Sequence, residues 1–324
     1  MKVLVADKFE AFGLQSLKEL GFEVDFQPDL STEQLPEVAK TLGCEVLIVR
    51  STKVPAAVFE AAAALRLVVR AGAGYDTIDI AAAGAKGVAV ANCPGTNSTA
   101  VAELVIGLMI AADRRIPAQV ADLRQGKWDK KGYAKARGIK GSTLGVIGMG
   151  TIGRLVAQRA LALEMQVLYS DIVACTELDA NPNVRRVSVD DVFAQADVIT
   201  LHVPGSGDTK HLVNNRSLGL MKKHALLINT SRGTVVDTAA LAAALREGRI
   251  GGAALDVYEN EPAATDTAIN NELLSLPNFI GTHHVGASTD QAQNAVAELA
   301  VEIIKTFRDT QNVMHCVNKD SLKV

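Results

Sequence analysis

The chain has 324 residues, of which 48% are hydrophobic and 21% are charged. This length is about twice that of a typical domain, so we expect two hydrophobic cores, and the composition excludes a largely disordered chain. The formal net charge of -3 supplies no overall positive field. We therefore expect neither nucleic acid nor a membrane surface as a partner, and any anion site must be local.

Short apolar runs rich in β-branched residues alternate along the chain with longer segments rich in Ala, Leu and Glu. This rhythm is typical of βαβ units on a mainly parallel sheet that has helices on both faces. In chain order we expect strands at 2–6, 46–49, 67–69, 144–147, 167–169, 198–201, 225–228, 252–255 and 279–281. The apolar stretch at 100–112 is too short to span a membrane and predicts a buried helix.

Two breaks divide this pattern. A turn-rich segment at 94–98 indicates a domain boundary near residue 97. A second turn is followed by a capping-box pattern from Ser288 to Gln291, which predicts a helix running to about Phe307. We expect an α/β protein with two doubly wound parallel-sheet domains, in which a Rossmann-type cofactor domain (98–287) is inserted in a flavodoxin-like substrate domain (1–97 and 288–324).

The four cysteines are scattered, with no CxxC pair and no neighbouring ligands for a metal. We read them as reduced and mostly buried, and we expect no metal site. The first residues run directly into the apolar segment 3–6, which is too short for the core of a signal peptide. A cytoplasmic location is the resulting expectation.

A glycine-rich sequence, GMGTIG at 148–153, directly follows an expected strand and opens a helical pattern. In this context the motif predicts a dinucleotide site, where glycines admit the pyrophosphate and the helix supplies amide donors. Asp171 ends the next strand, where it can accept hydrogen bonds from ribose hydroxyls and repel a 2'-phosphate. No basic residue adjoins it within 169–172, which favours NAD over NADP, although the motif alone leaves a flavin open. The predicted contacts are Gly148, Gly150, Thr151, Ile152, Gly153 and Asp171.

Three later segments each place a polar side chain just beyond an expected strand, in the region where open parallel sheets bind ligands. They contain Arg232, a carboxylate within 256–262 and an imidazole at His283 or His284. Oxidation of an alcohol by NAD needs a base for the hydroxyl proton, and an arginine fork suits a substrate carboxylate and keto oxygen. Taken singly, each residue also fits a cap or a surface ion pair.

The motifs NTSRG at 229–233, DVYENEP at 256–262 and HVGAST at 284–289 resemble those of the D-isomer-specific 2-hydroxyacid dehydrogenase family. The similarity extends over nearly the whole chain and implies an NAD-dependent enzyme with a catalytic trio of Arg232, Glu261 and His284. His283 stands where the family often has Pro; we assign the role to His284 because it directly precedes 285–287. The resemblance also implies cofactor contacts at Val203, Pro204, Thr230, Ser231, Arg232, Asp256 (near the nicotinamide amide), His284 and Ala287.

Within this family, segments 47–54 and 70–76 are most similar to members that oxidise D-3-phosphoglycerate to 3-phosphohydroxypyruvate in serine biosynthesis. That likeness implies that Arg50 and Arg70 contact the substrate phosphate and that the amides around Gly72 and Ala73 contact its carboxylate. The alternative is that both arginines are solvated or form ion pairs. The expected substrate residues are Arg50, Ser51, Arg70, Gly72, Ala73, Gly74 and Asn97.

Other features bear on partners and on alternative functions. The resemblance implies a homodimer or higher homo-oligomer formed through the region after helix 100–112, and the basic segment 127–140 fits an anionic substrate or a solvated loop. The segment between Glu261 and His284 is longer than is typical of the resembled members, and its loop at 263–271 could alter access to the site. We expect no C-terminal regulatory domain and hence no serine inhibition through one. The alternatives are a glyoxylate or hydroxypyruvate reductase and an NAD-sensing interaction protein.

Overall fold

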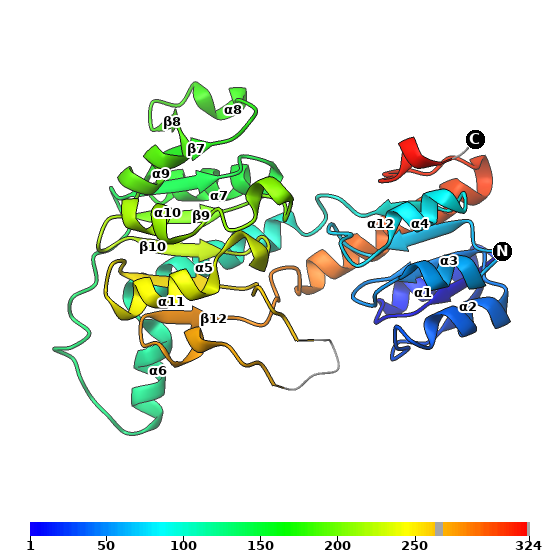
Figure 1. The fold of residues 1–324 in the computed structure, drawn as a ribbon, viewed down its shortest axis with the longest axis horizontal. Helices are drawn as coiled ribbons and strands as arrows, with labels where there is room; N and C mark the ends of the chain where they lie inside the picture. Colours follow the sequence, from blue (N-terminus) through cyan, green and yellow to red (C-terminus); the bar gives the residue numbers. More distant parts are fainter. Residues whose placement is uncertain (263–267, 323–324) are drawn as a thin grey trace. The chain divides into compact units, whose positions relative to one another are not determined.

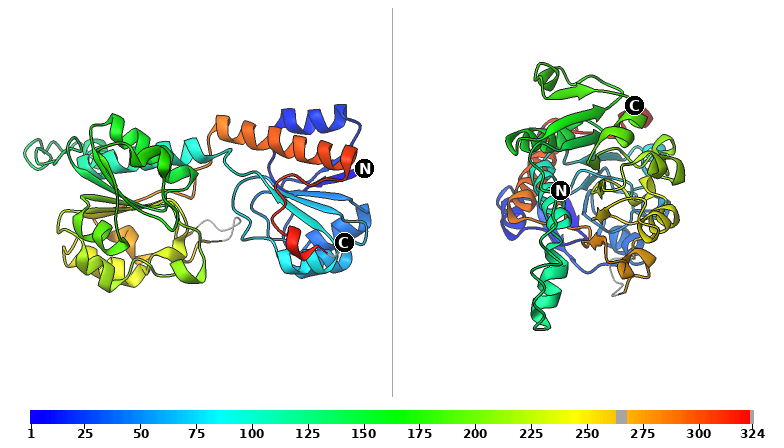
Figure 2. Two further views of the ribbon diagram at one scale, coloured as in Figure 1. Left: turned by 90° about the horizontal axis from the view of Figure 1, so that it is seen from above. Right: turned by 90° about the vertical axis from the view of Figure 1, so that its left-hand side faces the viewer.

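The computed structural model describes residues 1–262 and 268–322. The chain forms two compact units (Figure 1). We call Met1–Asn97 with Ser288–Val324 the terminal unit, and Ser98–Ala287 the central unit. In each unit, helices cover both faces of a single sheet, as Figure 2 shows. The predicted α/β class with two doubly wound parallel sheets is confirmed.

The terminal unit is built on five parallel strands in the order β2-β1-β3-β4-β5, the arrangement of flavodoxin-like folds. Alternate residues of β1 pack into two cores, with Val3 and Val5 in one and Leu4 in the other. The strands are β1 (Lys2–Val5), β2 (Glu23–Phe26), β3 (Val46–Val49), β4 (Leu67–Arg70) and β5 (Ala89–Asn92). The helices are α1 (Ala11–Glu19), α2 (Leu35–Leu42), α3 (Ala56–Ala61), α4 (Ile80–Ala85), α12 (Asp290–Thr310) and the 3-10 turn η4 (Lys319–Ser321).

The central unit has seven parallel strands in the order β12-β11-β10-β9-β6-β7-β8, a Rossmann sheet extended by one strand. The strands are β6 (Thr143–Ile147), β7 (Gln166–Ser170), β8 (Val184–Arg186), β9 (Val198–Leu201), β10 (Leu226–Asn229), β11 (Gly252–Leu255) and β12 (Phe279–Gly281). The helices are α5 (Ser98–Arg114), α6 (Ile116–Arg124), α7 (Thr151–Ala162), α8 (Thr176–Asp179), α9 (Val189–Gln195), α10 (Asn215–Leu220) and α11 (Thr238–Arg246). The described residues of this unit also form the 3-10 turns η1 (Gly207–Thr209), η2 (Gly233–Val235) and η3 (Glu272–Ser275).

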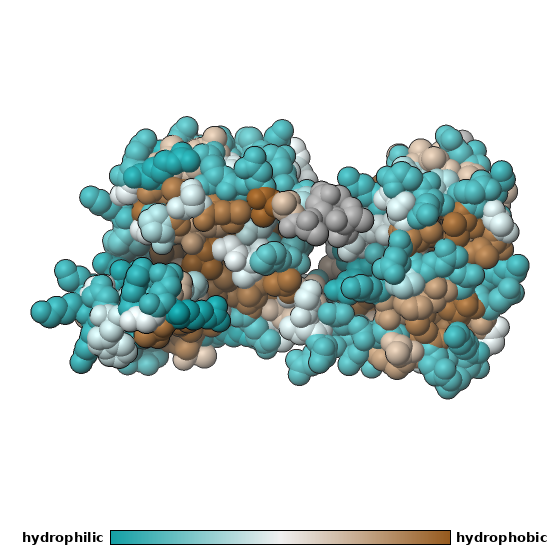
Figure 3. All heavy atoms as spheres, turned by 90° about the horizontal axis from the view of Figure 1, so that it is seen from below, coloured by the Kyte–Doolittle hydropathy of each residue, from teal (hydrophilic) through white to brown (hydrophobic). Residues whose placement is uncertain are grey.

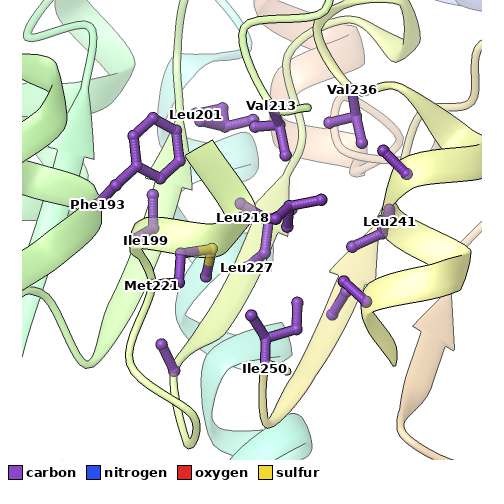
Figure 4. Packing of buried hydrophobic residues seen from close by; sticks show 14 of the residues in the cluster. Phe193, Ile199, Leu201, Val213, Leu218, Met221, Leu227, Val236, Leu241 and Ile250 are labelled. Atoms are coloured by element: carbon purple, nitrogen blue, oxygen red, sulfur yellow. The ribbon is translucent and has the colours of Figure 1, made fainter. Parts of the chain in front are cut away.

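The core of the central unit holds the strand ends in place. On one face of the sheet, Phe193, Leu218 and Leu241 pack against strand residues such as Ile199 and Leu227 (Figure 4). A second cluster on the other face includes residues of α5 and α7. The central strands of this sheet are largely apolar because both of their faces are buried, and polar residues such as Asn229 stand at strand ends.

Every strand predicted from the sequence is present, with bounds shifted by no more than one residue at either end, and three further strands were not predicted. β2 carries Glu23 and Asp25 and is exposed or half-buried throughout, so its apolar signal is weak. β5 is fully buried but rich in Ala, which reads equally well as helix. β8 has three residues, two of them exposed arginines.

The predicted cap of the last helix was wrong by one residue. Thr289, not Ser288, is the N-cap of α12, and its Oγ1 accepts a hydrogen bond from Ala292 N at 3.2 Å. Both residues carry a hydroxyl, so local chemistry did not distinguish them. The register that buries Ala292, Ile303 and Phe307 decides between them. The helix ends at Thr310, three residues beyond the expected end.

All four cysteines are free thiols, as expected, with Cys44, Cys93 and Cys175 buried and Cys316 partly buried. Burial raises the pKa of Cys44 and Cys93 to about 11, so neither is a reactive thiolate at neutral pH. Within residues 1–262 and 268–322, no helix is long and apolar enough to cross a membrane.

Candidate active site

The glycine-rich loop joins the end of β6 to the start of α7, as predicted. Gly148 has a φ of +94, and a Cβ there or at Gly153 would overlap a backbone carbonyl oxygen. Over Gly150, by contrast, no described atom lies within 4 Å of the position that a Cβ would take. The loop is therefore closely packed at Gly148 and Gly153 and open at Gly150. Thr151 and Ile152 provide the first amides of helix α7, an arrangement that suits a pyrophosphate.

Asp171 follows β7 and lies beside this loop. Its Oδ2 accepts a hydrogen bond from Met149 N at 2.5 Å, and its Oδ1 accepts one from Val173 N at 2.9 Å. A hollow of 310 Å³ opens beside it. The residues that line the hollow are Met149, Gly150, Arg154, Asp171, Ile172, Val173, Ala174 and Cys175.

The fold also brings two arginines to this place, which corrects the picture of an acid without basic neighbours. Arg154 lines the hollow, and Arg186 Nη2 donates to the Asp171 carbonyl oxygen at 2.7 Å. Neither is adjacent to Asp171 in sequence. Arg154 is held by an ion pair with Glu177 at 3.4 Å, so its charge is partly compensated.

The turn after β10 carries Thr230, Ser231 and Arg232, and the fully buried Asn229 organises it. Asn229 Oδ1 accepts from Ser231 N at 2.9 Å, and Asn229 Nδ2 donates to the Arg232 carbonyl at 2.9 Å. Arg232 Nη1 donates to the Ser231 carbonyl at 2.9 Å. Sequence reasoning missed Asn229, although its place as the last residue of an apolar strand was a usable signal.

In the structure, the side chain of His284 is paired with the carboxylate of Glu261. His284 Nδ1 lies 2.8 Å from Glu261 Oε2, while Glu261 Oε1 accepts from Tyr258 N at 3.0 Å. The hydrogen bond that His284 donates to Glu261 raises the pKa of His284, against the opposing effect of burial. Burial acts to raise the pKa of Glu261, but the hydrogen bonds from His284 and Tyr258 and the charge of Arg232 outweigh it and lower the pKa. His283 is exposed.

Asp256 fixes the loop that carries His284. It is 1% exposed, and its Oδ1 accepts from Thr282 Oγ1 at 2.6 Å and from Val285 N at 2.9 Å. Its Oδ2 accepts from Gly286 N at 2.9 Å. These bonds bracket His284, which has a φ of +52. Asp256 therefore holds the loop that carries His284 in shape.

The remaining cofactor residues lie in loops of the same unit. Val203 adjoins the glycine loop, with its Cγ1 at 3.1 Å from the position of a Gly148 Cβ. The Pro204 carbonyl accepts from Thr209 Oγ1 at 2.5 Å. Ala287 is the last residue of the central unit. Part of the long segment 263–271 falls at 263–267, outside the described residues.

In the terminal unit, the predicted substrate residue Arg50 is fixed at both ends by residues that sequence reasoning missed. Asp7 Oδ2 accepts hydrogen bonds from the amides of Arg50 at 2.7 Å, Ser51 at 3.0 Å and Thr52 at 3.0 Å. Arg50 Nη1 donates to Gln293 Oε1 on α12 at 3.1 Å. The Ser51 amide is therefore already hydrogen-bonded to Asp7. The guanidinium of Arg50 is oriented by Gln293 of α12, a helix that begins 240 residues later.

The second substrate segment, 70–76, follows β4. The Arg70 guanidinium lies over Gly72, whose φ is +146, and Arg70 Nη1 is 3.4 Å from the Ala71 carbonyl oxygen. Asn92 Nδ2 donates to the Ala73 carbonyl at 2.6 Å and steadies the loop in which Gly74 follows. Asn97 Oδ1 is buried and has no hydrogen-bond partner among the described residues.

The central unit fits a nicotinamide dinucleotide. The glycine loop is open where a pyrophosphate would pass, and Asp171 directly follows β7. The buried Thr230 hydroxyl has no hydrogen-bond partner within the described ranges. At the same edge of the sheet, an imidazole paired with a carboxylate lies near an arginine. Fold and site together define a dinucleotide-binding α/β protein equipped for acid-base chemistry.

Comparison with known proteins identifies the family. The profile of the D-isomer specific 2-hydroxyacid dehydrogenase NAD-binding domain matches residues 106–286, and the chain belongs to this family. The chain is 43% identical over 324 residues to the D-3-phosphoglycerate dehydrogenase of Methanocaldococcus jannaschii, with 99% of this chain and 60% of that protein covered. The chain thus spans well under two thirds of the length of that relative.

Two further similarities support the assignment. The hydroxypyruvate reductase of Thermotoga maritima is 42% identical over 273 residues, which cover 84% of this chain and 85% of that protein. Among solved structures, the TT0316 protein from Thermus thermophilus matches with a TM-score of 0.89 and 33% identity, covering 98% of this chain and 100% of that chain.

Proposed function

We propose that the protein transfers a hydride between NAD and C2 of a D-2-hydroxy acid, and so interconverts the hydroxy acid and its 2-keto acid. The observation that carries the proposal is the hydrogen bond of 2.8 Å between His284 Nδ1 and Glu261 Oε2. Oxidation of an alcohol needs a base for the hydroxyl proton. Glu261 orients the ring through Nδ1, so that Nε2 is the nitrogen that takes this proton.

The protonation state of His284 serves both directions of the reaction. The Glu261 hydrogen bond raises the pKa of His284, so the ring accepts the hydroxyl proton readily and returns it to the keto oxygen in reduction. Arg232 presents a planar fork suited to the substrate carboxylate and the keto oxygen, where negative charge develops. Bound NAD supplies the acceptor or donor of the hydride.

We infer D-3-phosphoglycerate as the substrate, with 3-phosphohydroxypyruvate as product, a reaction that serves serine biosynthesis. The relative from Methanocaldococcus jannaschii supports this choice. So does the pairing of Arg50 with Gln293, which holds a cationic group at the carboxyl end of β3 where a phosphate can be bound. In this assignment the terminal unit is the substrate-binding domain and contacts the carboxylate through amides near Gly72.

A reductase for hydroxypyruvate or glyoxylate is the second candidate. The relative from Thermotoga maritima, which matches over most of both chains, favours it. The same catalytic trio serves such a substrate, but no phosphate contact is needed. The role of Arg50 therefore distinguishes the two candidates.

The decisive experiment follows NADH oxidation with phosphohydroxypyruvate, hydroxypyruvate and glyoxylate, with NADPH in parallel. We expect a preference for phosphohydroxypyruvate and for NADH, because Asp171 repels a 2'-phosphate. A preference for an unphosphorylated acid would contradict the phosphoglycerate assignment. No turnover of any keto acid despite tight NADH binding would contradict the enzymatic proposal and favour an NAD-sensing role.

A matched pair of arginine variants isolates the phosphate contact. Arg50→Ala should raise KM for phosphohydroxypyruvate about tenfold and leave KM for glyoxylate unchanged. Arg66 is the control, because it too bonds a glutamine of the terminal unit, Gln311, at 2.5 Å. Arg66→Ala should alter neither KM. Equal effects of Arg50→Ala on both substrates would remove Arg50 from the phosphate site.

We further propose a homodimer formed through α6. This helix buries none of its side chains, and Ile116, Val120 and Leu123 are 44%, 38% and 56% exposed. Trp128, just beyond it, is 80% exposed. Figure 3, which colours one face of the molecule by hydropathy, shows apolar residues at the surface. Exposed apolar patches commonly mark interfaces between proteins. Light scattering of Val120→Glu should show a monomer where the wild type shows a dimer.

A further inference from the structure

A second histidine–carboxylate pair lies in the central unit, close in sequence to the first. His211 Nε2 is 2.6 Å from Glu259 Oε1, and the two side chains are 36% and 24% exposed. Burial acts to raise the pKa of Glu259, but hydrogen bonds from His211 and Thr238 outweigh it and lower the pKa. Glu259 stands two residues before Glu261. The catalytic assignment above gives His211 and Glu259 no role.

The pair connects loops that follow three different strands. His211 lies after β9, and its amide donates to the Thr234 carbonyl at 2.9 Å. Val213 then forms a parallel bridge with Val236, so this loop runs beside the segment that leaves the Arg232 turn. Glu259 lies after β11, and its Oε2 accepts from Thr238 N at 3.4 Å, at the start of α11.

The backbone of the Arg232 turn rests directly on the Glu259 segment. A Cβ at Gly233 would overlap the Tyr258 carbonyl and lie 2.5 Å from Glu259 N, so nothing separates the two segments. Tyr258 N in turn donates to Glu261 Oε1 at 3.0 Å. The peptide between Tyr258 and Glu259 is thus held on one side by the Arg232 turn and on the other by the His211 pair.

We propose that His211 and Glu259 are positioning residues that keep the 258–261 turn in the shape in which Glu261 holds His284 for proton transfer. This inference rests on the proposed function and deepens it. The charged groups that act on His284 itself are Glu261, Asp256 and Arg232. Glu259 acts on the His284 imidazole only indirectly, by holding the 258–261 turn. Its own carboxylate is hydrogen-bonded to His211 and Thr238.

The chain offers a matched control for this role. His224 Nε2 lies 2.8 Å from Asp197 Oδ1, with side-chain exposures of 35% and 16%, and both residues precede strands of the same sheet. This pair resembles the His211 pair in geometry and burial but lies at the opposite ends of the strands. Replacement of His224 therefore reports the cost of losing a histidine–carboxylate pair as such.

The test compares His211→Asn, Glu259→Gln and His224→Asn in the full chain. Asn suits position 211 because its φ is +50, a conformation that Asn tolerates. We expect His211→Asn and Glu259→Gln each to lower kcat about tenfold, as loss of an orienting partner does, with an unchanged Kd for NADH. The pH at which keto-acid reduction loses activity should move down, because Glu261 no longer holds the proton on His284 as firmly.

Several outcomes would overturn the proposal. They are a pH profile of His211→Asn or Glu259→Gln that matches the wild type, or changes no larger than those of His224→Asn. If a variant does not fold, Glu259→Asp, which retracts the carboxylate by one methylene, takes its place with the same expected direction. The His284 ring can also be titrated by NMR without any substrate. An unchanged His284 pKa in Glu259→Gln would refute the positioning role, whereas absence of turnover in the wild type would refute only the proposed function.

Discussion

The two ends of the parallel sheet in the central unit both hold a histidine hydrogen-bonded to a carboxylate, yet they are built differently. Where β6, β9 and β10 begin, Asp197 Oδ1 contacts Lys222 Nζ at 2.9 Å and His224 Nε2 at 2.8 Å. Its Oδ2 accepts from Thr143 N at 2.9 Å. Where β10, β11 and β12 end, Glu261 instead binds the His284 imidazole beside the Arg232 turn.

The difference indicates why similar residues connect strands at one end of the sheet and are proposed to take part in the reaction at the other. Burial acts to raise the pKa of Asp197, but its bonds to His224, Thr143 and Lys222 outweigh this and lower the pKa to about 2. That carboxylate is a permanent anion joining the starts of three strands. At the carboxyl ends, the glycine loop lies at the same edge of the sheet as the paired imidazole, the edge at which open parallel sheets bind ligands.

The largest expected effect would test the chemical end directly. His284→Ala should lower kcat about a thousandfold, because it removes the acid-base group, while Kd for NADH stays unchanged. Stopped-flow measurement of hydride transfer, with fluorescence titration of NADH, checks both. His283→Ala is the matched control and should retain wild-type kcat. A large loss in the control but not in His284→Ala would move the catalytic role to His283.

The fastening end should respond in stability instead. Asp197→Ala should destabilise the protein by about 3 kcal/mol, because it leaves the partly buried groups of Lys222 and His224 and the Thr143 amide without their acceptor. Urea unfolding measures this, and kcat of the folded protein should not change. The exposed pair of Asp190 with Arg216 provides the control, since Asp190→Ala should cost far less.

The stability that Asp197 contributes should depend on pH in a predictable direction. The folded pKa of Asp197, about 2, lies below its ordinary 3.8. Its stabilising contribution is therefore complete above pH 3.8 and disappears as the pH falls toward 2. In Asp197→Ala this part of the acid-induced loss should be missing. An identical acid limb in both proteins would show that Asp197 does not fasten the sheet.

A smaller effect is expected when the charge of Glu261 is removed. Because Glu261 raises the pKa of His284, keto-acid reduction, which needs the protonated ring, should lose activity only as the pH rises through that raised value. Glu261→Gln should move this limb to lower pH, through loss of the hydrogen bond to the carboxylate and of its charge. Initial rates of NADH oxidation across pH measure it. A limb that stays in place would separate Glu261 from His284.

The smallest effect is expected at one arm of the Asp197 cluster. Lys222→Met should cost about 0.5 kcal/mol, because the lysine is partly exposed and two other donors to Asp197 remain. The loss should shrink further in high salt, where the wild-type ion pair is already screened. Unfolding in urea at two salt concentrations checks this. A loss as large as that of Asp197→Ala would mean that the ion pair alone fastens the strands.

Much of the site was readable from the sequence because strand ends are local events. Apolar runs such as Val46–Val49 predict buried strands, and the polar residues that follow β6, β7, β10, β11 and β12 fall together once the sheet is parallel. The positions of the glycine motif and of Asp171 could be predicted from the order of the strands alone. The register of α12 did not follow, because Ser288 and Thr289 offer the same capping chemistry and only burial of the helix face separates them.

By itself, the amino-acid sequence determined the α/β class, the strands with two buried faces, the dinucleotide loop and the segments that carry Arg232, Glu261 and His284. Only the tertiary structure decided which groups meet. Arg50 contacts Gln293 across 243 positions, Arg186 donates to the Asp171 carbonyl, and Glu261 is hydrogen-bonded to His284. The physical reason is that periodicity and turn chemistry act over a few residues, whereas hydrogen-bond partners in a parallel sheet come from strands separated by whole crossover helices.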